Sequence, residues 1–145
     1  LFQRTMSFIG GIDSGYTMTA DVMTDGNRRM KSSPGLVNQR YIVVLKGNHQ
    51  ELEITSNHER LKYAVPFKWR PKVWYRLTCR VDLEDDGTAV VRAKCWPRDE
   101  AEPDDWTIEF RHADGHAEGA PGLYGFTPQS RFAVYMDNIS VVPHE

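Results

Sequence analysis

The feature that most constrains the fold is a pair of alternating segments in mid-chain, 74–83 and 88–96, joined by the turn 84–87. Apolar side chains occupy every second position from Tyr75 to Leu83, and charged or hydroxyl side chains occupy most positions between them. A period of two over this length is typical of an antiparallel strand with one face on a core and the other in water. The acidic, glycine-containing turn completes the pattern of a β-hairpin. The solvent-facing side of this hairpin carries arginine, threonine, lysine and tryptophan, so we look for function there first.

The rest of the chain predicts an all-β domain. No segment has sustained helical periodicity, and short alternating or apolar segments are separated by turn residues. Such a series of eight or more strands favours a two-sheet antiparallel β-sandwich of the jelly-roll type. Besides the hairpin, the expected strands are 16–23, one or two within 35–45, 51–56, 60–65, 106–110, 122–126 and 132–142. A length of 145 residues suits one domain, 1–145, with a core of its own.

Charge and hydropathy exclude two classes of partner. The formal net charge is -2, which does not favour nucleic acid or an anionic membrane surface. No apolar run approaches the roughly 20 residues that cross a bilayer as a helix, so we expect no membrane insertion. The chain starts at Leu1, without an initiator Met or a signal peptide, and we interpret it as a domain excised from a larger protein.

The two cysteines lie on opposite arms of the hairpin, and both are expected on its inner face. If Leu83 pairs with Ala89, then Cys79 lies opposite Ala93, and Cys95 is its diagonal neighbour at roughly 7–8 Å. That separation is long for a disulfide. Two buried free thiols are the favoured interpretation, a disulfide would need a shifted register, and metal ligation lacks further partners at zinc-site spacing.

Three phrases, at 73–81, 119–126 and 134–141, resemble the concanavalin A-like (laminin G-like) jelly roll. The chain is more closely similar to the C-terminal domain of bacterial proteins with a pyrroloquinoline-quinone-enzyme-like β-propeller. Further counterparts in that group are the segments 38–41, 45–48, 65–69 and 101–103. The resemblance implies two curved sheets whose concave face often binds carbohydrate. It also implies adjacent domains in the same polypeptide and a secreted, periplasmic or cell-surface location.

A related branch, the 3-keto-disaccharide hydrolase domain, acts on glycosides, so the resemblance also raises an enzyme as an alternative. Laminarinase-type members carry a Glu-x-Asp-x-x-Glu strand, and this sequence has no such run. Glu51 and Glu53 share one strand face roughly 7 Å apart, within the range of an acid–base pair across a sugar. A solvated strand face explains them more simply. We therefore expect a non-catalytic module rather than an enzyme.

The predicted carbohydrate site combines aromatic and planar hydrogen-bonding side chains, which are the groups that bind sugars. By alternation, Trp96 shares the polar face of the hairpin with several basic residues. Asn38 and Arg40 share one face of the strand expected within 35–45. The predicted ligand-binding residues are Asn38, Arg40, Arg76, Arg80, Arg92, Lys94 and Trp96. Two alternatives stay open: the charges form a salt-bridge ladder worth under about 1 kcal/mol per pair, or the tryptophans pack against loops.

The resemblance implies a structural Ca²⁺ that joins the closing strand to an early loop. Asp137 and Asp13 are its expected ligands, with Asp21 and Asp25 as alternative partners of Asp137. His112 and His116 have the i,i+4 spacing that would suit a metal site on a helix. Here the two histidines lie in a glycine-containing segment, which we interpret as a flexible polar loop. The predicted function is a non-catalytic carbohydrate-binding module. The alternatives are a glycoside-active enzyme or a docking module for an adjacent β-propeller.

Overall fold

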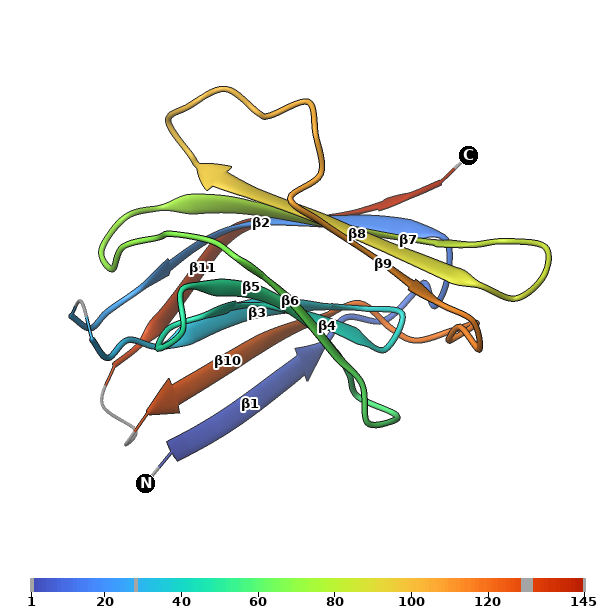
Figure 1. Ribbon diagram of the computed structural model, residues 1–145, viewed down its shortest axis with the longest axis horizontal. Coiled ribbons are helices and arrows are strands. Elements are labelled where there is room, and N and C mark those ends of the chain that lie inside the picture. Colours follow the sequence, from blue (N-terminus) through green and yellow to red (C-terminus); the bar gives the residue numbers. More distant parts are fainter. Residues whose placement is uncertain (1, 28, 129–131, 145) are drawn as a thin grey trace.

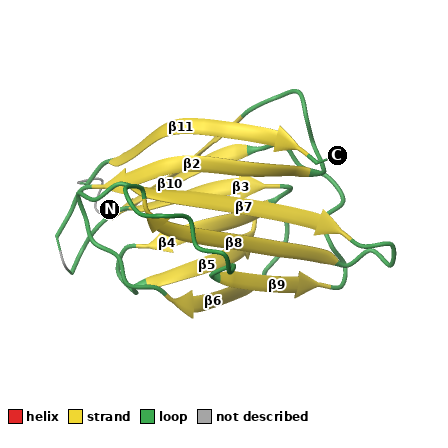
Figure 2. Ribbon diagram, turned by 90° about the horizontal axis from the view of Figure 1, so that it is seen from above, coloured by secondary structure: helices red, strands yellow, loops and turns green. Residues whose placement is uncertain are grey.

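The computed structural model describes residues 2–27, 29–128 and 132–144, and they form a β-sandwich of two antiparallel sheets (Figure 1). The six-stranded sheet has the order β1-β10-β3-β4-β5-β6, and the five-stranded sheet has the order β11-β2-β7-β8-β9 (Figure 2). The strands are β1 (Phe2–Phe8), β2 (Tyr16–Thr24), β3 (Ser33–Asn38), β4 (Tyr41–Lys46), β5 (Glu51–Ser56), β6 (Lys62–Pro66), β7 (Tyr75–Leu83), β8 (Ala89–Pro97), β9 (Ile108–His112), β10 (Gly122–Pro128) and β11 (Val134–Pro143). The predicted β-sandwich is confirmed. Within the described ranges, no helix has the length and apolar character to cross a membrane.

The β7–β8 hairpin has the predicted register. Leu83 pairs with Ala89, and Cys79 pairs with Ala93. Every second side chain from Tyr75 to Val81 faces the core, as the alternation predicted, whereas Leu83 at the end of β7 is exposed. Both cysteines are buried free thiols, and burial raises the pKa of the Cys79 thiol to about 12. The pair is therefore ordinary core packing and a poor source of nucleophiles.

Two buried tyrosines anchor loops at one end of the core. Tyr16 donates a hydrogen bond of 2.6 Å to the carbonyl oxygen of Gly119 and accepts one of 2.8 Å from the backbone N–H of Gln39. The hydroxyl of Tyr41 accepts from the backbone N–H of His116 at 3.1 Å. The loop 113–120 is thereby fixed against the turn that connects β3 to β4. A buried tyrosine needs a partner for its hydroxyl, and here each of the two hydroxyls has at least one partner in the loop 113–120.

The turn between β3 and β4 corrects one prediction. Gln39 and Arg40 both have positive φ, at 52° and 73°, and they form a two-residue hairpin turn. Because the turn interrupts the alternation, Asn38 pairs with Tyr41 and points into the core with it. The Asn38 amide nitrogen donates to the carbonyl oxygens of Tyr16 and Cys79 at 3.1 and 2.9 Å. The expected placement of Asn38 beside Arg40 on an open sheet face is therefore wrong.

Candidate functional site

The outer face of the five-stranded sheet, where most of the predicted ligand residues lie, is an ion-pair network. Asp21 is fully buried and accepts a hydrogen bond of 2.9 Å from Arg76. Arg80 binds both oxygens of Asp82 at 2.7 and 3.1 Å, and Arg92 reaches the same carboxylate at 3.3 Å. Arg76, Arg80 and Arg92 therefore form the salt-bridge ladder that the sequence offered as the alternative to a carbohydrate-binding face.

The loop 98–107 rises above the end of β8 in Figure 1, and Lys94 on β8 contacts it. The Lys94 ammonium pairs with Glu102 at 2.8 Å and lies 5.0 Å from the ring centre of Trp106 and 5.9 Å from that of Trp96. Only 6 % of Trp96 is exposed. The loop thus covers the sheet at Lys94, and Trp96 also lines a cavity at the end of the sandwich.

That cavity, which we call the aromatic cleft, has a volume of about 1020 Å³. It lies where the β4–β5 turn, the segment 67–71 and the end of β8 meet. Phe67, Trp69, Tyr75 and Trp96 supply its aromatic lining. The rings of Phe67 and Trp69 both meet Tyr75 edge-on, with centres 6.4 and 6.1 Å away. An apolar cleft of this size with a few polar groups is the usual form of a small-ligand site.

The polar groups of the aromatic cleft are an amide and three basic side chains. Gln50 accepts a hydrogen bond from the backbone N–H of Trp69 at 2.8 Å, while its Nε2 is buried and has no partner among the described residues. Lys31 lies with its ammonium 5.2 Å from the Trp69 ring centre, and burial lowers its pKa. Lys68 and Arg70 are exposed at the rim, and the described lining contains no carboxylate. The aromatic cleft is therefore basic, although the whole chain carries a net charge of -2.

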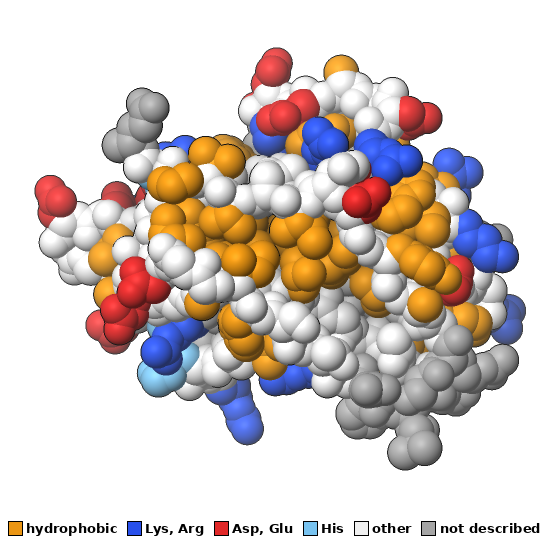
Figure 3. Space-filling view, turned by 180° about the vertical axis from the view of Figure 1, so that it is seen from behind, with side chains coloured by type: hydrophobic (Ala, Val, Ile, Leu, Met, Phe, Trp, Pro, Cys, Tyr) orange, Lys and Arg blue, Asp and Glu red, His pale blue; other side chains and the backbone are white. Residues whose placement is uncertain are grey.

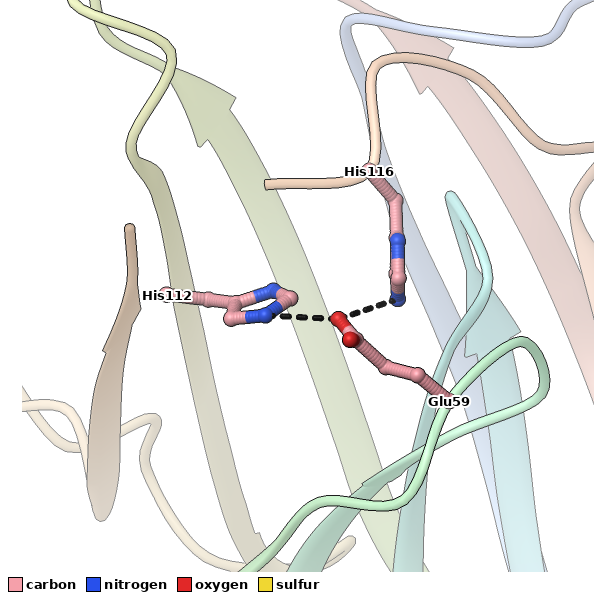
Figure 4. A group of neighbouring side chains, drawn as sticks. All are labelled: Glu59, His112 and His116. Carbon is pink, nitrogen blue, oxygen red and sulfur yellow. Dashed lines mark ion pairs between the residues drawn. The ribbon is translucent and has the colours of Figure 1, made fainter. Parts of the chain in front are cut away.

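A second group of functional side chains lies at the opposite end of the sandwich (Figure 4). Glu59, His112 and His116 bring their ligating atoms within 4.8 Å of one another. Sequence reasoning noted the spacing of the two histidines but interpreted their segment as a flexible polar loop. It missed Glu59 altogether, because only the fold brings the β5–β6 turn beside the end of β9. Arg40 also lies at this end, 3.0 Å from His58 Nδ1, so the turn places it far from the hairpin face.

The two aspartates expected to hold Ca²⁺ lie apart. Asp137 pairs with Asp21 in the middle of β2, whereas Asp13 precedes β2 and accepts a hydrogen bond from Gly119 at one end of the sandwich. The strand between Tyr16 and Asp21 alone spans roughly 17 Å. The structure therefore does not bring Asp13 and Asp137 together, and a structural Ca²⁺ at Asp137 with Asp21 or Asp25 as partner stays a prediction.

Glu51 and Glu53, the pair behind the enzyme alternative, lie on the outer face of β5. Only Glu53 is mostly buried, and its carboxylate lies 3.9 Å from the ammonium of Lys46 and 3.6 Å from that of Lys62. The arrangement explains the burial of Glu53 as an ion-pair site on the sheet.

Comparison with known proteins supports the fold and little beyond it. No family model matches the chain, and no curated protein matches it. Among solved structures, the chain is similar to a double mutant of congerin II, a galectin with a jelly-roll β-sandwich. The TM-score is 0.51 at 9 % identity, over 96 % of this chain and 99 % of that one. Identity this low shows the fold alone, so the jelly roll is confirmed and the relationship to propeller-associated domains stays a prediction.

Proposed function

We propose that this domain binds carbohydrate without transforming it, and that the aromatic cleft is its binding site. The observation that carries the proposal is the buried Nε2 of Gln50, which lacks an acceptor in the described structure and borders a cleft walled by aromatic rings. An unpaired buried amide costs about 1–3 kcal/mol. A sugar hydroxyl would accept its hydrogen bond while the sugar's C–H face packs on Phe67, the half-buried ring of the lining. The galectin-type fold supports the same function.

The charge of the aromatic cleft narrows the ligand to an acidic saccharide, such as a uronic acid or a sulfated sugar. Arg70 and Lys68 lie exposed at the rim, where their charges can meet a carboxylate or sulfate without being stripped of water. Charge-assisted hydrogen bonds are roughly twice as strong as neutral ones. A neutral sugar would use the aromatic walls and Gln50 but gain nothing from these two side chains.

The proposal includes the setting of the domain as one module of a larger secreted, periplasmic or cell-surface protein. The family resemblance of the sequence supports this setting. An enzyme acting through Glu51 and Glu53 has weaker support, because the Lys46 and Lys62 ammonium groups lie 3.9 and 3.6 Å from Glu53.

A glycan array followed by titration calorimetry tests the proposal. Gln50→Glu keeps the acceptor for the Trp69 N–H but removes the Nε2 donor and adds a negative charge. We expect it to weaken binding of an acidic glycan at least tenfold while the variant stays folded. Arg70→Ala should weaken acidic glycans more than neutral ones. Asn57→Asp adds the same charge at the opposite end of the sandwich and should bind like the wild type.

Two outcomes would overturn the proposal. The first is that the wild-type domain binds no glycan on an array that includes uronic and sulfated sugars. The second is that a glycan binds the wild type, Gln50→Glu and Arg70→Ala with equal affinity, which would place its site elsewhere.

A docking module is the second candidate, favoured by exposed apolar surface. Figure 3 shows hydrophobic side chains gathered across the face behind that of Figure 1. The exposed large hydrophobic residues of β1 and β11 are Phe8, Tyr135, Ile139 and Val142. Exposed apolar surface is a common feature of interaction sites. If an adjacent domain docks there, Val142→Asp in the full-length protein should increase proteolysis between the domains without changing glycan binding.

A further inference from the structure

We propose that Glu59, His112 and His116 form a binding site for a divalent transition metal of the Zn²⁺ type. The three residues come from different places: Glu59 from the β5–β6 turn, His112 from the end of β9, and His116 from the loop after it. Figure 4 shows all three side chains converging on one point. Two imidazoles and one carboxylate are a recurrent Zn²⁺ ligand set.

The distances suit a single ion. Glu59 Oε1 lies 2.7 Å from His112 Nε2 and 3.9 Å from His116 Nε2. Bonds of about 2.0–2.1 Å in a tetrahedron separate the ligand atoms by roughly 3.3 Å. The two observed distances lie on either side of that value. Each distance differs from that value by roughly 0.6 Å, and the Glu59 side chain, which is 43 % exposed, is free to move by this amount.

A buried hydroxyl orients both histidines. Tyr41 lies with its hydroxyl 2.7 Å from His112 Nδ1, and the same oxygen accepts the backbone N–H of His116. With Nδ1 engaged, the ring nitrogen of His112 that faces Glu59 is Nε2. Metal-binding histidines characteristically hold their second nitrogen in this way, which fixes ring orientation and tautomer.

Among the described residues, Ser56 competes with a metal for His116 Nε2. Its hydroxyl lies 2.7 Å from His116 Nε2, so metal binding must replace this contact. The same oxygen accepts the backbone N–H groups of His58 and Glu59 at 2.9 and 3.1 Å. Ser56 therefore keeps its hydrogen bonds to the turn when His116 turns to a metal, and the exchange leaves no buried polar group unpaired.

The site would keep an open coordination position. A cavity of about 470 Å³ borders Glu59 and His116 and is lined by Arg40, His58, Asp114 and Glu118. Three protein ligands beside an accessible cavity leave room for water or a small ligand on the metal. The acidic side chains of Asp114 and Glu118 favour the approach of a cation. This metal site is at the other end of the sandwich from the aromatic cleft, so it stands or falls independently of the proposed glycan binding.

Calorimetry and Co²⁺ absorption on the untagged, chelator-treated domain test the proposal. We expect the wild type to bind one equivalent of Zn²⁺ and to give the visible absorption of tetrahedral Co²⁺. Glu59→Gln, which alters a partly exposed side chain, and His112→Ala should each weaken Zn²⁺ binding at least 100-fold. Tyr41→Phe should weaken it 10–100-fold. His49→Ala, in the exposed turn at the opposite end, is the matched control and should bind like the wild type.

A thermal shift keeps the test informative if a variant is unstable. Zn²⁺ should raise the melting temperature of the wild type and of His49→Ala, but not that of Glu59→Gln. The proposal is overturned if the wild type binds neither Zn²⁺ nor Co²⁺ when the metal is added to about 100 μM, a concentration that detects dissociation constants up to that order. It is equally overturned if Glu59→Gln and His112→Ala bind Zn²⁺ as tightly as the wild type.

Discussion

Asp21 on β2 and Arg76 on β7 form an ion pair in which the carboxylate is fully buried and the arginine is 40 % exposed. The bond from Arg76 Nε to Asp21 Oδ1 is 2.9 Å long. The second carboxylate oxygen accepts from Asn138 at 2.7 Å and from Arg98 at 3.4 Å. Asp21 therefore connects the central strand β7 to the edge strand β11 through groups that themselves remain partly in water.

Replacing this carboxylate should destabilise the fold more than any exposed aspartate would. Asp21→Ala removes three hydrogen bonds to charged or amide donors, and we expect it to lower the free energy of unfolding by about 2–4 kcal/mol. The lower half of that range is favoured, because Arg76 and Arg98 can turn to solvent when their partner is lost. Urea unfolding measures the change. Asp137, which pairs with Asp21 across the two strands, is exposed. Asp137→Ala should lower the free energy of unfolding by less than about 0.5 kcal/mol. Equal effects of the two substitutions would contradict this account.

Asp21 should also make stability depend on pH in the acid range. Burial alone would raise its pKa, but the bonds from Arg76, Asn138 and Arg98 outweigh burial and hold the pKa below the ordinary value of 3.8. A carboxyl group with a lowered folded pKa stabilises the protein above its unfolded pKa, and this stabilisation is lost as pH falls through the folded pKa. We expect wild type to lose stability relative to Asp21→Asn below about pH 4, with the difference constant from pH 5 to 7. Urea midpoints at several pH values measure it, and parallel curves for the two proteins would rule the linkage out.

Asn38 should contribute to stability through both sheets at once. It belongs to β3 of the six-stranded sheet, and its amide binds carbonyl oxygens of Tyr16 and Cys79 in the five-stranded sheet. Asn38→Ala leaves a small void and weakens two buried acceptors, so we expect a loss of about 2–3 kcal/mol. Asn57→Ala, at an exposed turn position, is the matched control and should be nearly neutral. A loss below about 0.5 kcal/mol for Asn38→Ala would show that the sheets are held together without this contact.

The alternation of both arms and the turn 84–87 between them favoured the β7–β8 register in which Leu83 pairs with Ala89, and the structure has this register. The β3–β4 turn was not predictable in the same way. Gln39 and Arg40 take left-handed conformations that usually favour glycine or asparagine, so no turn signal marks the position. Strand β1 did carry a signal, since Met6 and Phe8 alternate with Thr5 and Ser7, yet the segment was not assigned.

The candidate sites were less accessible to sequence reasoning than the strands. Alternation correctly placed Arg76 and Trp96 on the outer face, but it carried no information on the loop 98–107 that covers the sheet at Lys94. The aromatic cleft and the group of Glu59, His112 and His116 are each assembled from loops far apart in the chain. Such proximity is decided by sheet order, which local patterns do not contain.

The buried thiols give a prediction about chemical reactivity. Burial raises the pKa of Cys79 to about 12 and raises that of Cys95 as well, so the thiolate fraction at pH 8 is roughly one in 10⁴ for Cys79. We expect a thiol reagent at pH 8 to leave the native domain unmodified over hours. The two cysteines should both react once guanidinium chloride unfolds the chain, without prior reduction. Ala117→Cys, at an exposed position, should add one rapidly reacting thiol to the native protein. Rapid modification of the native wild type would contradict the buried placement, and an unfolded chain without reactive thiols would show that Cys79 and Cys95 are bridged.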